Sequence, residues 1–271
     1  MPGFFLPLDG MKSYYAAFRL DFDAMTTKSS LMEFLNQDKN MHARESILMH
    51  RLFLDLQTAA ARNGYYLNTY FDDVDHDGFD VILDDQDSLK KVQVKTLGKG
   101  NTTGTWKIHR RLLRPALSDA ESLGFEASPT GVGTAGGVVL MEFDDDGNEL
   151  SVEYLYCDVY VLLALELGLF ERRHATQARA VSDVLKDWRN DESKFINVPK
   201  AAFWRTKSPA SLLALMGLHS LESFAWCGMV HKLVNLNRLT DEQASETLDC
   251  PLADYRAHAR SAFMSLLAEI E

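Results

Sequence analysis

The chain has 271 residues, of which 46% are apolar and 25% charged, and its formal net charge is −11. This size and composition suit one sizeable hydrophobic core and a second, smaller one. No apolar run approaches a membrane span, and the negative charge excludes nucleic-acid binding through the field of the whole protein. The three cysteines are widely spaced, which favours a reduced cytoplasmic protein without a zinc site.

Residues 1–39 are weakly periodic and are expected to form an N-terminal extension, with a strand in FRLDFDAM. A helix is predicted over residues 40–63 because apolar residues recur at spacings of three and four: Met41, Leu48, Leu52, Leu56 and Ala59. Glu45 falls on the same stripe. An acid on a buried helix face is costly unless a partner or a metal compensates it. The alternative is a glutamate that reaches solvent or pairs with a basic side chain.

Strands are predicted near residues 65–71, 79–84 and 91–96, where FDVIL and KVQVK alternate apolar and polar residues on either side of a turn. Alternation places Gln93 and Lys95 on one face of their strand and Val94 on the other. Asp80 on the adjoining strand can then meet an amide oxygen and an ammonium group. This combination predicts a site for a hard cation beside a lysine, which is typical of metal-assisted phosphodiester hydrolysis.

Charge is segregated around these strands. Residues 72–87 hold eight aspartates and no basic residue, whereas residues 88–115 hold eight basic residues and no acid. Within the second stretch, KGNTTGTWKIHRR can offer backbone N–H groups, cations and an aromatic ring to phosphates and bases. The candidate nucleic-acid contacts are Lys99, Trp106, Lys107, His109, Arg110 and Arg111. The alternative is a solvated basic loop that balances the aspartates.

A second motif overlaps the site. Asp73, Asp75, Asp77 and Gly78 spell DxDxDG, the opening of an EF-hand calcium loop. The remainder does not fit, because the eighth position is Asp80, the twelfth is Asp84 rather than Glu, and the flanks alternate like strands. A turn between strands explains the motif better.

Beyond the basic stretch we expect a helix over 108–123, a glycine-rich link, and strands over 137–143 and 151–157. After Asp158 the pattern is helical over 159–170, 174–190, 208–236 and 239–270, with a short strand and turn in KFINVPKAAFW. The sequence therefore predicts an α/β protein divided into an extension (1–39), a core (40–158) and a helical C-terminal part (159–271). That last part could form a homodimer or partner interface, or be ordinary core.

The order helix acid, strand aspartate, then Gln-x-Lys on the next strand resembles the PD-(D/E)XK nuclease superfamily, in its Gln-x-Lys, Mrr-like branch. The matching residues are Glu45, Asp80, Gln93 and Lys95, within residues 40–145. The resemblance implies a restriction-endonuclease-like mixed sheet flanked by helices, with Mg²⁺ or Mn²⁺ held by Asp80, Gln93, the Val94 carbonyl and Glu45. It also implies DNA as substrate and a setting in restriction or antiviral defence.

The chain departs from the common pattern of that superfamily at two places. Gln93 stands where an acid is usual, and no proline precedes Asp80. A neutral amide is a weaker metal ligand. An inactive nuclease fold that binds nucleic acid or a protein partner therefore stays open as an alternative, as does a calcium-binding interaction protein.

Overall fold

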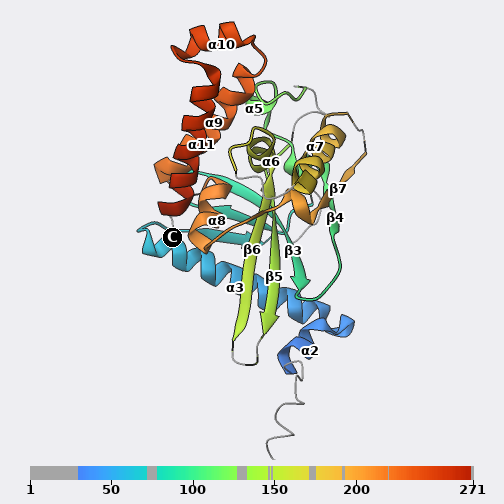
Figure 1. Cartoon of the computed structure of the whole chain (residues 1–271). Coiled ribbons are helices and arrows are strands. Elements are labelled where there is room, and N and C mark those ends of the chain that lie inside the picture. Colours follow the sequence, from blue (N-terminus) through green and yellow to red (C-terminus); the bar gives the residue numbers. More distant parts are fainter. Residues whose placement is uncertain are drawn as a thin grey trace, which may run out of the picture.

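The computed structural model describes residues 30–71, 78–126, 133–145, 147, 149–170, 175–190, 193–218 and 220–269 (Figure 1). The strand expected in FRLDFDAM lies outside these residues. Within the described part, the chain forms a mixed sheet of six strands with helices packed around it, which confirms the expected α/β class. No described helix is long and apolar enough to cross a membrane.

The six strands lie in the order β1-β2-β3-β5-β6-β8. Their bounds are β1 Asn68–Phe71, β2 Val81–Asp84, β3 Leu89–Gly98, β5 Gly137–Asp145, β6 Leu150–Asp158 and β8 Trp204–Arg205. Strands β3 and β5 are parallel, and every other neighbouring pair is antiparallel. The strands predicted over 79–84, 91–96, 137–143 and 151–157 are thus confirmed as β2, β3, β5 and β6.

Helix α3 (Met41–Arg62) covers one face of this sheet, as the apolar repeat predicts. It buries Leu48, Leu52 and Leu56 completely or nearly so. The hydroxyl of Tyr154 on β6 donates a 2.6 Å hydrogen bond to Asp55 of α3. Register pairs Tyr154 with Met141 and Met141 with Thr96, so these three side chains share the face that α3 covers. Helix α2 (Ser30–Asn36) and the short η1 (Asp38–Asn40) precede it.

The connection between β3 and β5 differs from the single helix expected over 108–123. It contains β4 (Thr105–His109) and two short helices, α4 (Arg110–Leu113) and α5 (Leu117–Ala120). Pro115 explains the break, because proline lacks an N–H and disfavours helical backbone at the residue before it. Arg114 accordingly has an extended backbone with ψ at 147°. Strand β4 pairs with β7 (Phe195–Pro199) in a separate two-stranded sheet.

The chain beyond residue 158 is mostly helical, as predicted, but it also completes both sheets. Its helices are α6 Val159–Glu166, α7 Ala175–Asn190, α8 Pro209–Met216, α9 Ser220–Leu236, α10 Asp241–Leu248 and α11 Leu252–Glu269. The short strand and turn expected in KFINVPKAAFW are β7 and η2 (Lys200–Ala202), and β8 follows them. Because β7 pairs with β4 and β8 with β6, the expected boundary at residue 158 passes through shared sheets. A single cluster of buried residues extends from Met32 to Leu267.

Candidate active site

Asp80 lies at the point where β2 separates from β3. Its backbone N–H donates to the carbonyl of Val92 at 2.9 Å, one residue away from the regular pairing of Val81 with Val92. Its carboxylate accepts a 2.6 Å hydrogen bond from the backbone N–H of Val94. The Asp80 side chain therefore takes the place of the neighbouring strand as the hydrogen-bond partner of the Val94 N–H.

The carbonyl of Val94 points to the same side as its N–H, toward Asp80, because the N–H and C=O of one strand residue point toward the same neighbouring strand. Gln93 precedes it, and the side-chain oxygen Oε1 of Gln93 is buried without a hydrogen-bond partner among the described residues. Buried polar atoms are nearly always satisfied, and one left unpaired costs about 1–3 kcal/mol. A carboxylate, an amide oxygen and a backbone carbonyl are the hard oxygen ligands that Mg²⁺ takes, so these residues fit a metal ion.

Lys95 shares the face of Gln93, since the two are separated by one residue on a regular strand. Its neighbour on β5 is Leu140, which is fully buried. Lys95 itself is partly buried. The face that carries Gln93 and Lys95 is opposite to the face that α3 covers, because Thr96 lies on the α3 side. The structure thus places Gln93 and Lys95 on one face of β3, and the Asp80 carboxylate at the N–H of Val94, the residue between them.

Glu45 does not lie where its spacing places it. The expectation of a buried carboxylate is wrong: its side chain is 55% exposed, and it lies 3.8 Å from Nδ1 of His42. Met41, on the same predicted stripe, is also exposed. The apolar stripe contacts the core only from Leu48 onward, so the first two turns of α3 extend beyond the core. Since α3 covers the opposite face of the sheet, Glu45 is left out of the ligand set that the strands supply.

Two residues of the predicted nucleic-acid-binding segment are engaged within the protein. Arg110 is only 4% exposed, and its Nη2 donates to the Ser193 hydroxyl at 3.1 Å. Its burial places it among structural residues rather than phosphate contacts. Lys99 is exposed, but its ammonium group lies 2.5 Å from the carboxylate of Asp144, which raises its pKa.

The other four candidates differ in exposure. Trp106 is partly buried and packs edge-on against Phe203. His109 caps α4, since its Nδ1 accepts from the Arg111 N–H at 3.2 Å. Lys107 and Arg111 are exposed on β4 and α4. These two are the cations of the segment that can reach a polyanion.

The calcium motif is described only at its last residue, because Asp73, Asp75 and Asp77 lie outside the described residues. Gly78 has a φ of +76°, and a Cβ there would lie 2.5 Å from Cβ of His109. Glycine is therefore required by both the backbone and the approach of β4, a requirement that does not involve a metal. Because Gly78 is two residues before Asp80 in the chain, its contact with His109 also places His109 at the edge of the site.

An ionic cluster that the sequence does not reveal lies on the same face as Lys95. Glu142 of β5 accepts hydrogen bonds from Lys200 and from Arg205, and Arg205 also contacts Glu153. Burial pushes the pKa of Glu142 upward, but the hydrogen bonds from Lys200 and Arg205 outweigh it and lower the pKa. The partners are 58 and 63 residues away in the chain, so no local pattern could indicate them.

Among the described residues, no group of three His, Cys, Asp or Glu side chains is arranged to hold a metal ion. Among the described residues, a metal beside Asp80 would therefore have one carboxylate together with amide and carbonyl oxygens. Comparison of this chain with protein-family models, with curated proteins and with solved structures gives no match in any of the three.

Proposed function

We propose that this protein is a metal-dependent nuclease that hydrolyses phosphodiester bonds of DNA. The observation that carries the proposal is the buried, unpaired Oε1 of Gln93 beside the Asp80–Val94 hydrogen bond. Natural folds seldom leave such an atom unsatisfied unless a ligand completes it. The element order also supports the proposal, since α3, β1, β2, β3, a crossover with helices and then β5 is the order expected of a restriction-endonuclease-like core.

In this mechanism Asp80, the Val94 carbonyl and Gln93 Oε1 would hold the metal. When bound, Mg²⁺ or Mn²⁺ neutralises charge on the scissile phosphate and lowers the pKa of bound water. Asp80 stays fixed because the Val94 N–H orients its carboxylate. Lys95, on the same face as Gln93, would position the attacking water and donate a hydrogen bond from its ammonium group to a phosphate oxygen, stabilising the negative charge that develops there. Lys107 and Arg111 supply phosphate contacts farther along the substrate.

The role in restriction or antiviral defence rests on the PD-(D/E)XK resemblance and the cytoplasmic setting on the three widely spaced cysteines, and both stay predictions. The same holds for a homodimer or partner subunit. A catalytically silent module of the same fold is the second candidate function. It is favoured by the exposed position of Glu45, which leaves Asp80 as the one carboxylate of the proposed ligand set among the described residues. This candidate would bind DNA through Lys107 and Arg111 without cutting it.

Metal binding and DNA cleavage, measured on the same variants, test the proposal. We expect the wild type to bind Mn²⁺, seen by water-proton relaxation, and to cleave DNA with Mg²⁺ or Mn²⁺. Asp80→Ala should lose both properties, because it removes the only charged ligand. Lys95→Met should keep metal binding but lose cleavage by at least about 100-fold, the scale of one electrostatic catalytic group.

Lys186→Met, an exposed lysine of α7, is the matched control and should behave like the wild type. Metal binding that Asp80→Ala leaves intact would reject the site. Metal and DNA binding without cleavage under any condition would favour the silent module instead.

A further inference from the structure

Strand β1 lies at the outer edge of the main sheet, because β2 is its one neighbour among the described strands. An edge strand exposes a row of N–H and C=O groups, which proteins usually protect with charged side chains, proline or a bulge. The sequence of β1, NTYF, contains no charge and no proline, and all 4 residues pair with β2 in regular register. Within the described residues, its short length is the protection that remains.

The hydrogen bonds between β2 and β3 determine which backbone groups of β2 point toward β1. At the turn that joins the two strands, the N–H of Asp85 donates to the carbonyl of Ser88 at 3.2 Å. Hydrogen-bonded and non-hydrogen-bonded pairs alternate along an antiparallel ladder. Every second residue of β2 before Asp85 therefore bonds to β3, and the residues between them, Ile82 and Asp84, bond to β1.

The same alternation then applies to β1. The register partners of these two residues are Tyr70 and Asn68, so the backbone groups of Tyr70 and Asn68 point toward β2. The N–H and C=O groups of Thr69 and Phe71 point the other way, to the side where no described strand lies. Each of these two residues thus offers a donor and an acceptor at the spacing of a strand.

Exposed apolar side chains lie on both faces of the sheet at this edge. On the face covered by α3, Phe71 is 58% exposed and packs edge-on against Phe53 with 5.0 Å between the ring centres. On the opposite face Tyr70 is 49% exposed. Leu89, which shares that face through the register of the first three strands, is 69% exposed. An added strand would cover part of this surface, since its side chains alternate between the two faces.

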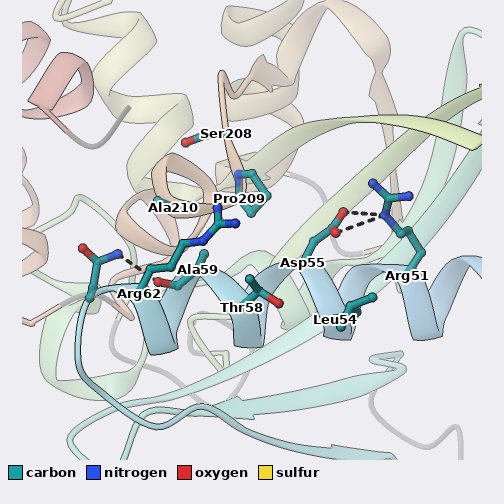
Figure 2. Close-up of a pocket in the computed structure, with 10 residues that line it drawn as sticks. Arg51, Leu54, Asp55, Thr58, Ala59, Arg62, Ser208, Pro209 and Ala210 are labelled. Atoms are coloured by element: carbon teal, nitrogen blue, oxygen red, sulfur yellow. Dashed lines mark hydrogen bonds and ion pairs between the residues drawn. The ribbon is translucent and has the colours of Figure 1, made fainter. Parts of the chain in front are cut away.

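The charge beside this edge is negative and is not neutralised. Asp84, Asp85 and Asp87 lie at the turn between β2 and β3, where the first two accept hydrogen bonds from backbone N–H groups of that turn. None of the three makes an ion pair with a basic side chain among the described residues. In the groove between α3 and α8, by contrast, Arg51 neutralises Asp55 at 2.9 Å (Figure 2). The acidic turn attracts a basic segment and repels a second copy of this chain, whose net charge is −11.

We propose that the outer edge of β1 binds an extended, basic segment of a partner protein, which adds a strand to the sheet. The backbone groups of Thr69 and Phe71 would pair with that segment, and lysine or arginine side chains on it would lie near the acidic turn. Main-chain hydrogen bonds give such a complex its affinity, and alternate side chains give it specificity. Neither Gln93 nor Lys95 belongs to this edge, so the proposal does not depend on the proposed nuclease activity.

Fluorescence anisotropy of dye-labelled, end-capped peptides with the full chain tests the proposal. The peptides have about eight residues, enough to pass the whole of β1, and alternate valine with lysine, serine or glutamate. We expect the lysine peptide to bind, the serine peptide to bind more weakly, and the glutamate peptide not to bind. The affinity of the lysine peptide should fall as NaCl is added, because salt screens exposed charges.

Thr69→Pro tests the backbone pairing. It replaces an outward N–H with the proline ring and keeps the pairing with β2, since proline is tolerated on an edge strand at such a position. Binding of the lysine and serine peptides should weaken at least about tenfold. Thr69→Ala is the matched control and should bind like the wild type, because it keeps the N–H. Asp87→Lys should weaken the lysine peptide and leave the affinity of the serine peptide unchanged.

The proposal is overturned if Thr69→Pro binds the peptides as Thr69→Ala does, if the glutamate peptide binds as tightly as the lysine peptide, or if no peptide binds at millimolar order. Self-association of the wild type that Thr69→Pro abolishes, seen by sedimentation velocity, would also overturn it, because a second copy would then occupy the edge. Melting curves show whether both Thr69 variants are folded. If Thr69→Pro is not, the effect of Asp87→Lys on the lysine and serine peptides decides.

Discussion

Two lysines of the same strand, Lys90 and Lys95, lie on opposite faces of the main sheet and in opposite electrostatic settings. Lys90 is 7% exposed, and its ammonium group lies 2.9 Å from the carboxylate of Asp158, which is fully buried. Lys95 is partly buried on the face of β3 that carries Gln93, and the Gln93 side-chain oxygen has no hydrogen-bond partner among the described residues. One setting is complete and the other is not.

The completeness of the Lys90 setting extends to each group around it. Asp158 Oδ2 also accepts from the Tyr156 hydroxyl at 2.9 Å, and Oδ1 accepts from the Val161 N–H at 2.8 Å, which caps α6. Burial, followed by the charge of Asp158, raises the pKa of Tyr156 well above its ordinary value, so Tyr156 stays a neutral donor. A buried ion pair whose two carboxylate oxygens both have donors contributes to a defined structure.

This difference teaches that burial of charge alone does not mark a functional site in this protein. Both lysines are removed from bulk water to some degree. What separates them is whether the fold satisfies the polar atoms that it buries. The incomplete setting is the one where a ligand would restore the missing interaction, which is why the proposed chemistry is assigned to Lys95 and not to Lys90.

Replacing each lysine with methionine tests the difference between the two settings most directly. Lys90→Met leaves Asp158 buried without its cation, and breaking a buried pair in this way costs about 3–5 kcal/mol of unfolding free energy. Lys95→Met should change stability by less than about 1 kcal/mol, because no buried anion loses its partner. Urea denaturation of both variants measures the difference.

Asp158→Ala gives an independent reading of the same pair, since it should destabilise to a similar degree by leaving Lys90 buried and charged. Equal loss of stability in Lys90→Met and Lys95→Met would remove the distinction between the two faces. In that case Lys95 would be a structural residue, and the proposed catalytic role would lose its support.

The sequence predicts these two faces well because strand alternation is a local property. Gln93 and Lys95 lie on one face of β3 as the period of two predicts, and α3 occupies Met41–Arg62 as its apolar repeat indicates. Glu45 shows the limit of this reasoning. Helical spacing gives its direction around the axis but not how far the core extends along it, and the core ends short of its turn.

Pairings between distant segments are a second limit. Strand β4 follows a glycine-rich loop and has its partner β7 about ninety residues later, so TWKIH reads as part of a loop and helix until that partner is known. The burial of Arg110 follows from the same pairing, because its backbone N–H donates to Lys194 just before β7 begins. The run of basic residues in the sequence therefore predicts more exposed positive charge than the fold presents, since Arg110 is buried.

Replacing Gln93 tests whether its unpaired side-chain oxygen costs stability and binds a metal. Gln93→Met keeps the size of the side chain and removes the buried oxygen, so the variant should gain about 1–3 kcal/mol of unfolding free energy by losing an unsatisfied group. It should at the same time lose Mn²⁺ binding, since the oxygen is a proposed ligand. A gain in stability with a loss of binding is the expected signature of strain kept for function. A variant that becomes less stable would indicate that the oxygen has a partner in solution.

The smallest expected change in stability is that of replacing Glu142, which lies on the same face as Lys95 and has its charge neutralised by Lys200 and Arg205. Its pKa is lowered from 4.5 because hydrogen bonds from Lys200 and Arg205 outweigh the opposing effect of burial. A carboxyl group with a lowered folded-state pKa contributes stability above its unfolded pKa, and that contribution disappears as the pH falls through the folded value. Glu142→Gln should therefore be slightly less stable than the wild type at pH 7, and the two should converge below about pH 4.

Urea denaturation of Glu142→Gln and the wild type at a series of pH values measures this difference in stability. Because Glu142 is partly exposed, the difference should stay below that of Lys90→Met at every pH. A wild type that gains stability relative to Glu142→Gln as the pH falls from 5 to 3 would show that the carboxylate is not held as the cluster requires.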